Sequence, residues 1–251
     1  MITICFTYFK SLTLANLAAA LYSVSRQEYS RVREVVFIDN NSDDSYEDVL
    51  HAVEQFRFPV PVIFRSFKHG DRLKTHAWST NKAVSEARSS WVLFTRADYL
   101  LDFDLVKKFV ECIERTPDWN GFVTSNGCHL GVDIDACEKT DWRRTGPQFA
   151  GAVFDYTTID TGVYLMRKSA LDKVGGLDES LTAWGHAQTH FQHKLHASGV
   201  EFVRIPETLF YHPAHGGEKD INLAHAQLAA TGVDLKECWT RYHGVSPYAS
   251  L

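Results

Sequence analysis

The sequence predicts an α/β protein, a single domain whose mostly parallel sheet is flanked by helices. Short apolar segments alternate with segments of helical spacing along residues 2–95, which is the order of elements in such sheets. Two expected strands, Glu34–Ile38 and Trp91–Thr95, are apolar throughout or nearly so, as is typical of strands covered on both faces. Polar residues follow the strands that end near Phe6, Ile38 and Thr95. Because ligands bind beyond the carboxyl ends of parallel strands, these residues are expected to border one crevice.

Each expected element rests on a local pattern. Residues 2–6, 34–38, 60–65 and 91–95 are short runs of mainly apolar residues and are expected to be strands. Residues 12–24 carry Leu, Ala and Val at helical spacing after Ser11, a candidate N-cap, and residues 45–56 and 76–87 are the next expected helices. Beyond residue 104 we expect helices at 105–116, 180–198 and from 221 onward, with strands at 121–125, 161–166 and 202–206.

A long stretch, residues 126–159, shows no regular periodicity and is rich in Gly, Asp, Arg and aromatic residues. Long loops inside a compact domain are usually functional or disordered. The aromatic residues Trp142, Phe149, Phe154 and Tyr156 favour an ordered loop.

Composition places the chain among ordinary globular proteins. It has 251 residues, of which 45% are hydrophobic and 23% charged, enough for one full core. The net charge of −5 predicts neither a general nucleic-acid-binding surface nor a membrane surface.

The five cysteines are odd in number and widely spaced, with no CxxC pair, which favours reduced thiols. The first residues, Met1-Ile-Thr-Ile-Cys-Phe-Thr-Tyr8, lack the pattern of a signal peptide, and no apolar run is long enough for a transmembrane segment. We therefore expect a cytoplasmic protein.

Several motifs occur in a fixed order along the chain. Thr7-Tyr8 ends the first expected strand, Asp39-Asn-Asn-Ser-Asp43 ends the second, Asn81 lies in the third helix, and Thr95-Arg-Ala-Asp98 ends the fourth strand. Gly175-Gly-Leu-Asp-Glu179 and Trp184-Gly185 follow later. Over roughly residues 2–216 this series resembles the family 2 glycosyltransferases. No motif is specific alone, but their joint order and spacing carry the resemblance.

The resemblance implies a GT-A, Rossmann-like fold and a nucleoside-diphosphate sugar as donor. It further implies transfer of a hexose-type sugar to the hydroxyl group of an acceptor, a saccharide or another hydroxyl-bearing molecule. A divalent metal, manganese or magnesium, and inversion at the sugar carbon are the defaults of the family. Residues 1–220 would form the GT-A domain, with residues 1–104 as the nucleotide-sugar half, 105–220 as the acceptor half and 221–251 as a C-terminal helical extension.

The resemblance assigns a set of residues to the donor. Asp39 would accept hydrogen bonds from the edge of the base, and Asn41 would shape the turn that follows. The alternative for this cluster is an Asx-rich turn that caps the next helix. The remaining expected donor residues are Thr7, Tyr8, Asn81 and Arg96, with Tyr8 placed to stack on the base.

The expected metal ligands are Asp98 and His212. A divalent cation stabilises the charge that grows on a departing diphosphate, and carboxylate oxygen suits magnesium and manganese. Arg96 stands where the family usually has a first acidic residue; it cannot bind a metal but could contact phosphate. His212 is the first choice for a late imidazole ligand, ahead of His215. Two other acidic pairs are judged decoys, Asp102 with Asp104 as helix capping and Asp133 with Asp135 as loop residues.

The general base is where the sequence departs from the family. Ala187 and Gln188 occupy the positions of the usual Glu-Asp pair, and neither can take a proton. His190, His186 and Asp178 are the remaining candidates, since an imidazole near its ordinary pKa can act as a base.

The acceptor is expected to contact Trp142, Arg143 and Trp184. A flat indole suits a sugar face, and an arginine suits an anionic group. The long loop has a second interpretation as a lid or an oligomer contact. Two alternatives also stay open for the whole protein: a retaining transferase, which needs no separate base, and an inactive GT-A domain that serves as a binding module.

Overall fold

The computed structural model describes residues 1–9, 12–69, 75–115, 119–133, 162–182, 186–214 and 221–233. Its strands are β1 (Ile2–Phe9), β2 (Val32–Asn40), β3 (Val62–Phe67), β4 (Trp91–Arg96), β5 (Leu100–Leu101), β6 (Gly121–Asp133), β7 (Tyr164–Arg167) and β8 (Glu201–Ala214). Its helices are α1 (Leu14–Ser25), α2 (Tyr46–Gln55), α3 (His76–Glu86), α4 (Leu105–Arg115), α7 (Lys168–Lys173), α8 (His186–Ala197) and α9 (Ile221–Ala230).

The described strands form one sheet in the order β3-β2-β1-β4-β7-β6-β8-β5. The four strands β3, β2, β1 and β4 pair in parallel, as the sequence predicts. Beyond β4 the sheet becomes mixed, because β7 runs antiparallel to both β4 and β6, while β6 and β8 pair in parallel. The predicted α/β class is therefore confirmed, with the parallel part concentrated in the first half of the chain.

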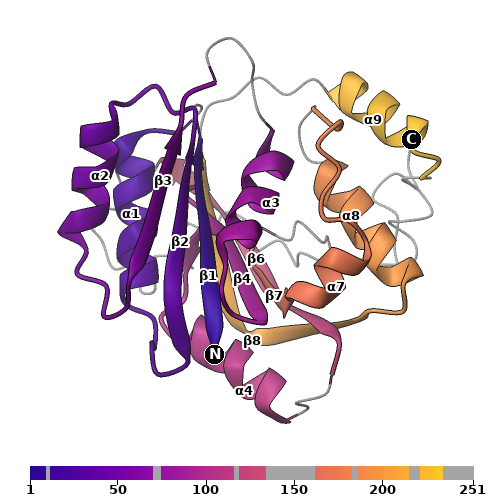
Figure 1. The fold of residues 1–251 in the computed structure, drawn as a ribbon, viewed down its shortest axis with the longest axis horizontal. Helices are drawn as coiled ribbons and strands as arrows, with labels where there is room; N and C mark the ends of the chain where they lie inside the picture. Colours follow the sequence, from indigo (N-terminus) through magenta and orange to yellow (C-terminus); the bar gives the residue numbers. More distant parts are fainter. Residues whose placement is uncertain are drawn as a thin grey trace.

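Helices cover both faces of the sheet (Figure 1). On one face, Phe6 and Tyr8 of β1 belong to a core that includes residues of α1, α2 and α4. On the other face, Cys5 belongs to a second core with residues of α3, α7 and α8. Successive strand residues point to opposite faces, so an apolar strand serves both cores at once. This explains why the first strands read as continuous apolar runs.

The first three helices begin at short polar side chains that cap them. The Thr13 side chain accepts from the Asn16 backbone N–H, and the Asn16 side chain accepts from the Thr13 backbone N–H, a reciprocal capping box. Thr13 is thus the N-cap of α1 in place of Ser11, which lies outside the described residues. Ser45 and Thr75 cap α2 and α3 in the same way, each satisfying a backbone N–H that the helix leaves unpaired.

Several elements are longer than their local patterns indicate. β1 continues through Phe9, so Thr7 and Tyr8 are strand residues rather than loop residues. β6 and β8 pair with each other along most of their length, and β6 ends at Asp133. The first part of the stretch 126–159 is therefore strand, and the expectation of an irregular segment is wrong there, as is the expectation that Asp133 is a loop residue. The pairing of β6 with β8 shifts register between Ser125 and Asn126. The strand therefore lacks one continuous alternation of side chains that sequence analysis could detect.

The last described helix, α9, packs against α8. The rings of His186 and His225 stack with their centroids 5.0 Å apart and an angle of 28° between their planes, and Gln227 Nε2 donates to Thr182 Oγ1 at 2.8 Å. Among the helices of the described ranges, none combines the length and apolar character needed to cross a bilayer.

Candidate functional site

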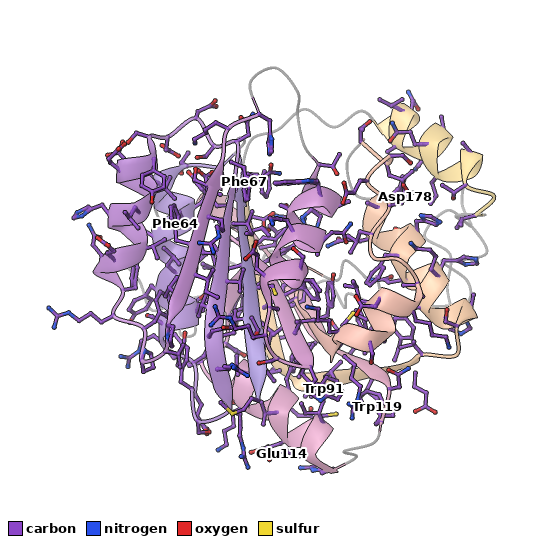
Figure 2. All side chains as sticks on the ribbon, viewed as in Figure 1. Phe64, Phe67, Trp91, Glu114, Trp119 and Asp178 are labelled. Atoms are coloured by element: carbon purple, nitrogen blue, oxygen red, sulfur yellow. The ribbon has the colours of Figure 1, made fainter. Side chains whose placement is uncertain are left out.

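The predicted polar residues gather at one edge of the sheet, where β1, β2 and β4 end. Phe67, at the carboxyl end of β3, marks this edge in Figure 2, and Trp91, at the start of β4, marks the opposite one. Strand pairing sets Thr7 beside Ile38 and Arg96, so the ends of β1, β2 and β4 lie level with one another. The candidate site is therefore this carboxyl edge of the sheet, where the strand order predicts a crevice.

Asp39 is fully buried at the end of β2 and its carboxylate already has three partners. It accepts from the Ser42 backbone N–H at 3.1 Å and from Ser66 Oγ at 2.5 Å, and Lys68 Nζ lies at 3.1 Å. Lys68 also donates to the backbone oxygens of Ser42 and Asp44. Asp39 thus organises the turn that follows β2 and ties it to β3. The hydrogen bond from the Ser42 backbone N–H is of the kind that the alternative of an Asx-rich turn describes.

Asn41 takes a left-handed backbone conformation in the same turn, with φ of 57°. Asparagine adopts this conformation more readily than most residues. Its backbone N–H donates to Phe67 O at 2.8 Å, and its side-chain oxygen accepts from the His69 backbone N–H at 3.0 Å. Asn41 therefore joins the ends of β2 and β3 and gives the turn its shape.

Thr7 and Tyr8 lie on opposite faces of β1. Thr7 Oγ1 is buried and has no hydrogen-bond partner among the residues that the structure describes, an unusual state for a polar atom. The Tyr8 ring is fully buried in the core, and its hydroxyl donates to Leu12 O at 3.2 Å and contacts the Asp44 carboxylate. Burial and the neighbouring carboxylate of Asp44 raise the pKa of Tyr8. In this arrangement no ring face of Tyr8 is exposed for stacking.

Arg96, Asp98 and His212 converge at the end of β4. Asp98 is almost fully buried and binds the guanidinium of Arg96 through both oxygens, with Nε–Oδ1 at 3.0 Å and Nη2–Oδ2 at 2.9 Å. His212, on β8, brings Nε2 to 3.5 Å from Asp98 Oδ2. The two expected metal ligands are thus neighbours although 114 positions separate them along the chain (212 − 98). Arg96 is the third member of the group.

Tyr99 packs against Arg96. Its side chain is fully buried, the Arg96 guanidinium lies over its ring with 4.6 Å from Cζ to the ring centroid, and its hydroxyl contacts Arg96 Nη2. A Cβ built on Gly162 would lie 2.0 Å from the ring, so only glycine fits at that position.

His76 belongs to the same edge and was missed at the level of sequence. It is the first residue of α3, and its Nε2 lies 3.1 Å from Gln188 Nε2. The pKa of His76 is lowered to about 3, chiefly because the surrounding protein desolvates the ring and then because Arg96 is positive, while Asp98 acts in the opposite direction. Gln188, one of the two substitutions at the family's base positions, therefore has a structural partner. The signal in the sequence is a histidine at the first position of the expected helix 76–87. A helix that follows a parallel strand begins near the carboxyl edge of the sheet, so this position borders the candidate site.

Asp178 and His190, two of the expected base candidates, lie together on the α8 side of the sheet. His190 Nδ1 is 3.6 Å from Asp178 Oδ2. Figure 2 labels Asp178 near α8, at the same edge of the molecule as Phe67. Desolvation lowers the pKa of His190, Lys194 lowers it further, and Asp178 opposes both. The pKa of Asp178 is lowered chiefly by the hydrogen bond from Ser180.

The segment 175–179 that carries Asp178 is held from two sides. On α3, Asn81 donates to Leu177 O at 2.9 Å and to Glu179 Oε1 at 3.0 Å, and accepts from Leu177 N. On α8, Lys194 Nζ donates to Val174 O and Gly176 O. Gly176 has φ of +70°, and a Cβ there would lie 2.6 Å from Asn81 Oδ1, so glycine is required. Asn81, an expected donor residue, is thus a bridge between α3 and this segment.

His186, the third base candidate, faces α9. Its ring stacks on His225, and burial together with that neighbour lowers its pKa. In the first decoy pair, Asp102 accepts from the Leu209 backbone N–H and the Tyr211 hydroxyl, which ties it to β8. Asp104 pairs with Lys108 of α4 at 3.0 Å. The expected acceptor residues Trp142, Arg143 and Trp184 lie outside the described residues, as do His215 and Asp135.

With this geometry in place, the comparisons with known proteins decide the family. A family model described as glycosyl transferase family 2 matches residues 3–174, well over half of the chain. The chain belongs to glycosyl transferase family 2. A second model, described as the N-terminal domain of galactosyltransferase, matches residues 136–216. The predicted resemblance is confirmed, and with it the prediction of a glycosyltransferase at the level of the family.

Solved structures show the same fold as this family 2 domain. S. aureus TarS 1-349 in complex with UDP superposes with a TM-score of 0.62 at 14% identity over 85% of this chain and 60% of that one. A second structure of S. aureus TarS 1-349 superposes with a TM-score of 0.62 at 13% identity over 96% of this chain and 78% of that one. GalNAc-T7 with UDP, GalNAc and Mn²⁺ gives 0.68 at 12% identity over 96% and 49%. No curated protein matches the chain in a sequence search.

The chain thus spans about half of the GalNAc-T7 chain and three fifths of the UDP-bound TarS chain. At these identities the superpositions establish the GT-A fold and nothing finer. They do not identify the donor, the acceptor or the metal of this family 2 domain.

Proposed function

We propose that this family 2 domain transfers a sugar from a nucleoside-diphosphate sugar to an acceptor hydroxyl, with inversion at the sugar carbon. The observation that carries the proposal is the meeting of Arg96, Asp98 and His212 at the carboxyl edge of the sheet. A cationic and a metal-binding type of side chain stand together at the end of a parallel strand, where such sheets bind their ligands. A diphosphate requires this combination because its charge grows as the sugar bond breaks.

The donor nucleotide is proposed to lie against the turn that follows β2. Asp39 contributes by holding this turn through Ser42, Ser66 and Lys68, and Asn41 by its left-handed conformation. Thr7 adds a buried hydroxyl oxygen near the same strand ends, and the described part of the chain offers it no hydrogen-bond partner, so it is suited to a ligand or water. UDP is the first nucleotide to test because two structurally similar proteins were crystallised with it.

A divalent ion fits the side chains at the end of β4. A carboxylate and an imidazole are suitable donors for manganese, and a 3.5 Å separation of Asp98 Oδ2 and His212 Nε2 allows both to reach one ion. Among the described residues no group of three or more acidic, histidine or cysteine side chains forms a ready-made site. Asp98 and His212 would therefore share the ion with phosphate oxygens. When bound, the ion would stabilise the negative charge of the diphosphate.

His190 is proposed as the general base and Asp178 as the group that orients it. Asp178 Oδ2 lies 3.6 Å from His190 Nδ1, just beyond hydrogen-bond distance, and its negative charge favours a proton on Nδ1, which leaves Nε2 to accept one. The lowered pKa of His190 keeps the ring neutral, and so able to accept, at neutral pH. His186 is the weaker candidate because its ring packs on His225.

The acceptor is proposed to approach from residues 105–220, the half of the chain that carries α8. Trp142, Arg143 and Trp184 are the proposed contacts, on the grounds of their chemistry. Asp178 and His190 would face that side, while the nucleotide would be bound by residues 1–104.

The test is a panel of UDP-sugars incubated with the protein, with and without Mn²⁺, with release of UDP measured in the absence of acceptor and sugar transfer measured with saccharide acceptors. Metal-dependent release from one donor supports the proposal, and UDP binding without turnover of any donor would favour a binding module instead. Ala187 and Gln188 at the usual base positions are the observation that favours a retaining enzyme as second candidate. The anomeric configuration of the product distinguishes it from an inverting one.

A further inference from the structure

The carboxylate of Asp98 contacts two side chains, the guanidinium of Arg96 and the imidazole of His212. Both of its oxygens accept hydrogen bonds from the Arg96 guanidinium in the fork geometry that arginine forms with carboxylates. His212 approaches one of the same oxygens from β8. The side chain of Asp98 is 2% exposed, so little water competes with these contacts.

A divalent ion on Asp98 would compete directly with Arg96. Carboxylate-bound Mg²⁺ or Mn²⁺ lies roughly 2 Å from the oxygen, and Arg96 Nη2 is 2.9 Å from Oδ2, so the two cations would be within about 5 Å of each other. In a site shielded from water, two positive charges at this separation repel strongly. Metal binding and the Arg96–Asp98 pair are therefore antagonistic unless further negative charge enters the site.

We infer that Arg96 is a switch that blocks the metal-binding carboxylate until the donor diphosphate arrives. With the site empty, Arg96 neutralises Asp98 and lowers its affinity for a divalent ion. When a diphosphate enters together with the ion, its oxygens replace the carboxylate as partners of the guanidinium. Asp98 is then released to the ion. The inference rests on the proposed function, because it uses the diphosphate of the donor.

The surroundings of Arg96 suit a residue with two positions. Its guanidinium lies over the ring of Tyr99, which is held by Phe210 at 5.1 Å between ring centroids and by the close approach of Gly162. A cation can rotate over an aromatic face without losing its attraction to the ring. The Arg96 side chain is 13% exposed against 2% for Asp98, so the guanidinium lies closer to solvent than the carboxylate it covers.

The switch makes binding of the ion and binding of the diphosphate mutually dependent. The ion alone must break the Arg96–Asp98 pair without compensation, while the ion with the diphosphate gives Arg96 a new partner. Each ligand then raises the affinity for the other by the same factor, as linkage requires. Arg96→Ala should therefore act in opposite directions on the two ligands, which a merely structural role would not produce.

The test is calorimetric titration of wild type, Arg96→Ala and Arg96→Lys with Mn²⁺ alone and with UDP at saturating Mn²⁺. Arg31→Ala is the matched control, because Arg31 pairs with Glu114 next to the amino end of β2. We expect Arg96→Ala to bind Mn²⁺ alone about fivefold or more tightly and UDP about tenfold or more weakly, the latter being typical for loss of a charged hydrogen bond. Arg96→Lys should keep more UDP affinity than Arg96→Ala, because it retains the charge without the fork.

Unchanged or weaker binding of Mn²⁺ alone by Arg96→Ala, with a melting temperature close to wild type, would overturn the switch. If Arg96→Ala does not fold, Arg96→Gln, which removes the charge but keeps most of the side-chain length, carries the same comparison. Absence of UDP binding to wild type under every condition would refute the proposed donor instead. The titration with Mn²⁺ alone would still decide whether Arg96 competes for Asp98.

Discussion

Gln188 on α8 and His76 at the first turn of α3 bring their Nε2 atoms to 3.1 Å, which joins the two helices across the carboxyl edge of the sheet. Gln188 stands where the family usually has a carboxylate, and the partner it finds here is a neutral imidazole rather than an acceptor hydroxyl. The glutamine that replaces the usual carboxylate therefore takes part in the packing of α8 against α3.

The low pKa of His76 predicts acid sensitivity of the fold. Its folded pKa of about 3 lies below the ordinary value near 6.5, so the unfolded chain binds the proton first as the pH falls. The stability from this group is complete above about pH 6.5 and is lost progressively towards pH 3, by at most about 1.4 kcal/mol per pH unit. His76→Gln should reduce the loss of unfolding free energy between pH 7 and 5 in urea titrations. His51→Gln, at an exposed position of α2, should not, and equal curves for all three proteins would contradict the shifted pKa.

Asp39→Ala should weaken nucleotide binding with little effect on the chemical step. Its loss leaves Ser42 N, Ser66 Oγ and Lys68 without their shared partner and loosens the turn after β2. We expect about a tenfold weaker UDP affinity and a loss of roughly 2 kcal/mol in stability. Fluorescence titration and urea unfolding measure the two effects, with the exposed Asp48→Ala as control. A large fall in single-turnover rate at saturating donor, with affinity unchanged, would argue against this role.

Asp98→Asn should abolish the Mn²⁺ dependence of donor binding. Asparagine fills the same volume but carries no charge for an ion, and it leaves Arg96 with a neutral partner. His212→Ala should have the smaller effect, because it removes one ligand among several. Titration of UDP with and without Mn²⁺ tests both, and full Mn²⁺-dependent turnover by Asp98→Asn would show that the ion binds elsewhere.

His190→Ala should lower kcat by about a hundredfold or more if the imidazole is the base. Because its pKa is lowered, the wild-type rate should fall only when the pH drops below the ordinary histidine range, where the ring becomes protonated. Asp178→Asn should reduce kcat less and should shift that acid limb to lower pH, since Asp178 raises the pKa of the ring. A rate profile of His190→Ala with the same acid limb as wild type would exclude the assignment. His51→Ala, at an exposed position of α2, is the control.

Replacement of Trp142 and Arg143 by Ala should raise the acceptor KM while sparing donor hydrolysis and UDP affinity. Indole and guanidinium groups at this position would contact the acceptor and not the nucleotide. Initial rates over a range of acceptor concentrations provide the measurement. Equal damage to UDP binding would indicate a lid over the donor, and no change in either would remove the loop from the site.

Local pattern was enough for the first four strands, the first four helices and their order. Apolar runs and helical spacing identify β1 to β4 and α1 to α4, because these patterns arise within a few residues of chain. The motif order also identified the family, which the matching family model confirms. The pairing of β6 with β8 along most of their length was beyond local pattern, since it depends on partners some eighty residues apart (Gly121 with Glu201).

What the sequence by itself determined is which side chains stand at strand ends, namely Asp39 after Ile38 and Asp98 after Thr95. Tertiary structure alone decided how those side chains are used. The antiparallel pairing of β5 with β8 brings His212 to Asp98, and the packing of α3 against α8 brings His76 to Gln188. It also gave both oxygens of Asp98 to Arg96, a contact between near neighbours that spacing permits but does not require. Periodicity is a property of adjacent residues, whereas the partners of a buried charge depend on every element packed around it.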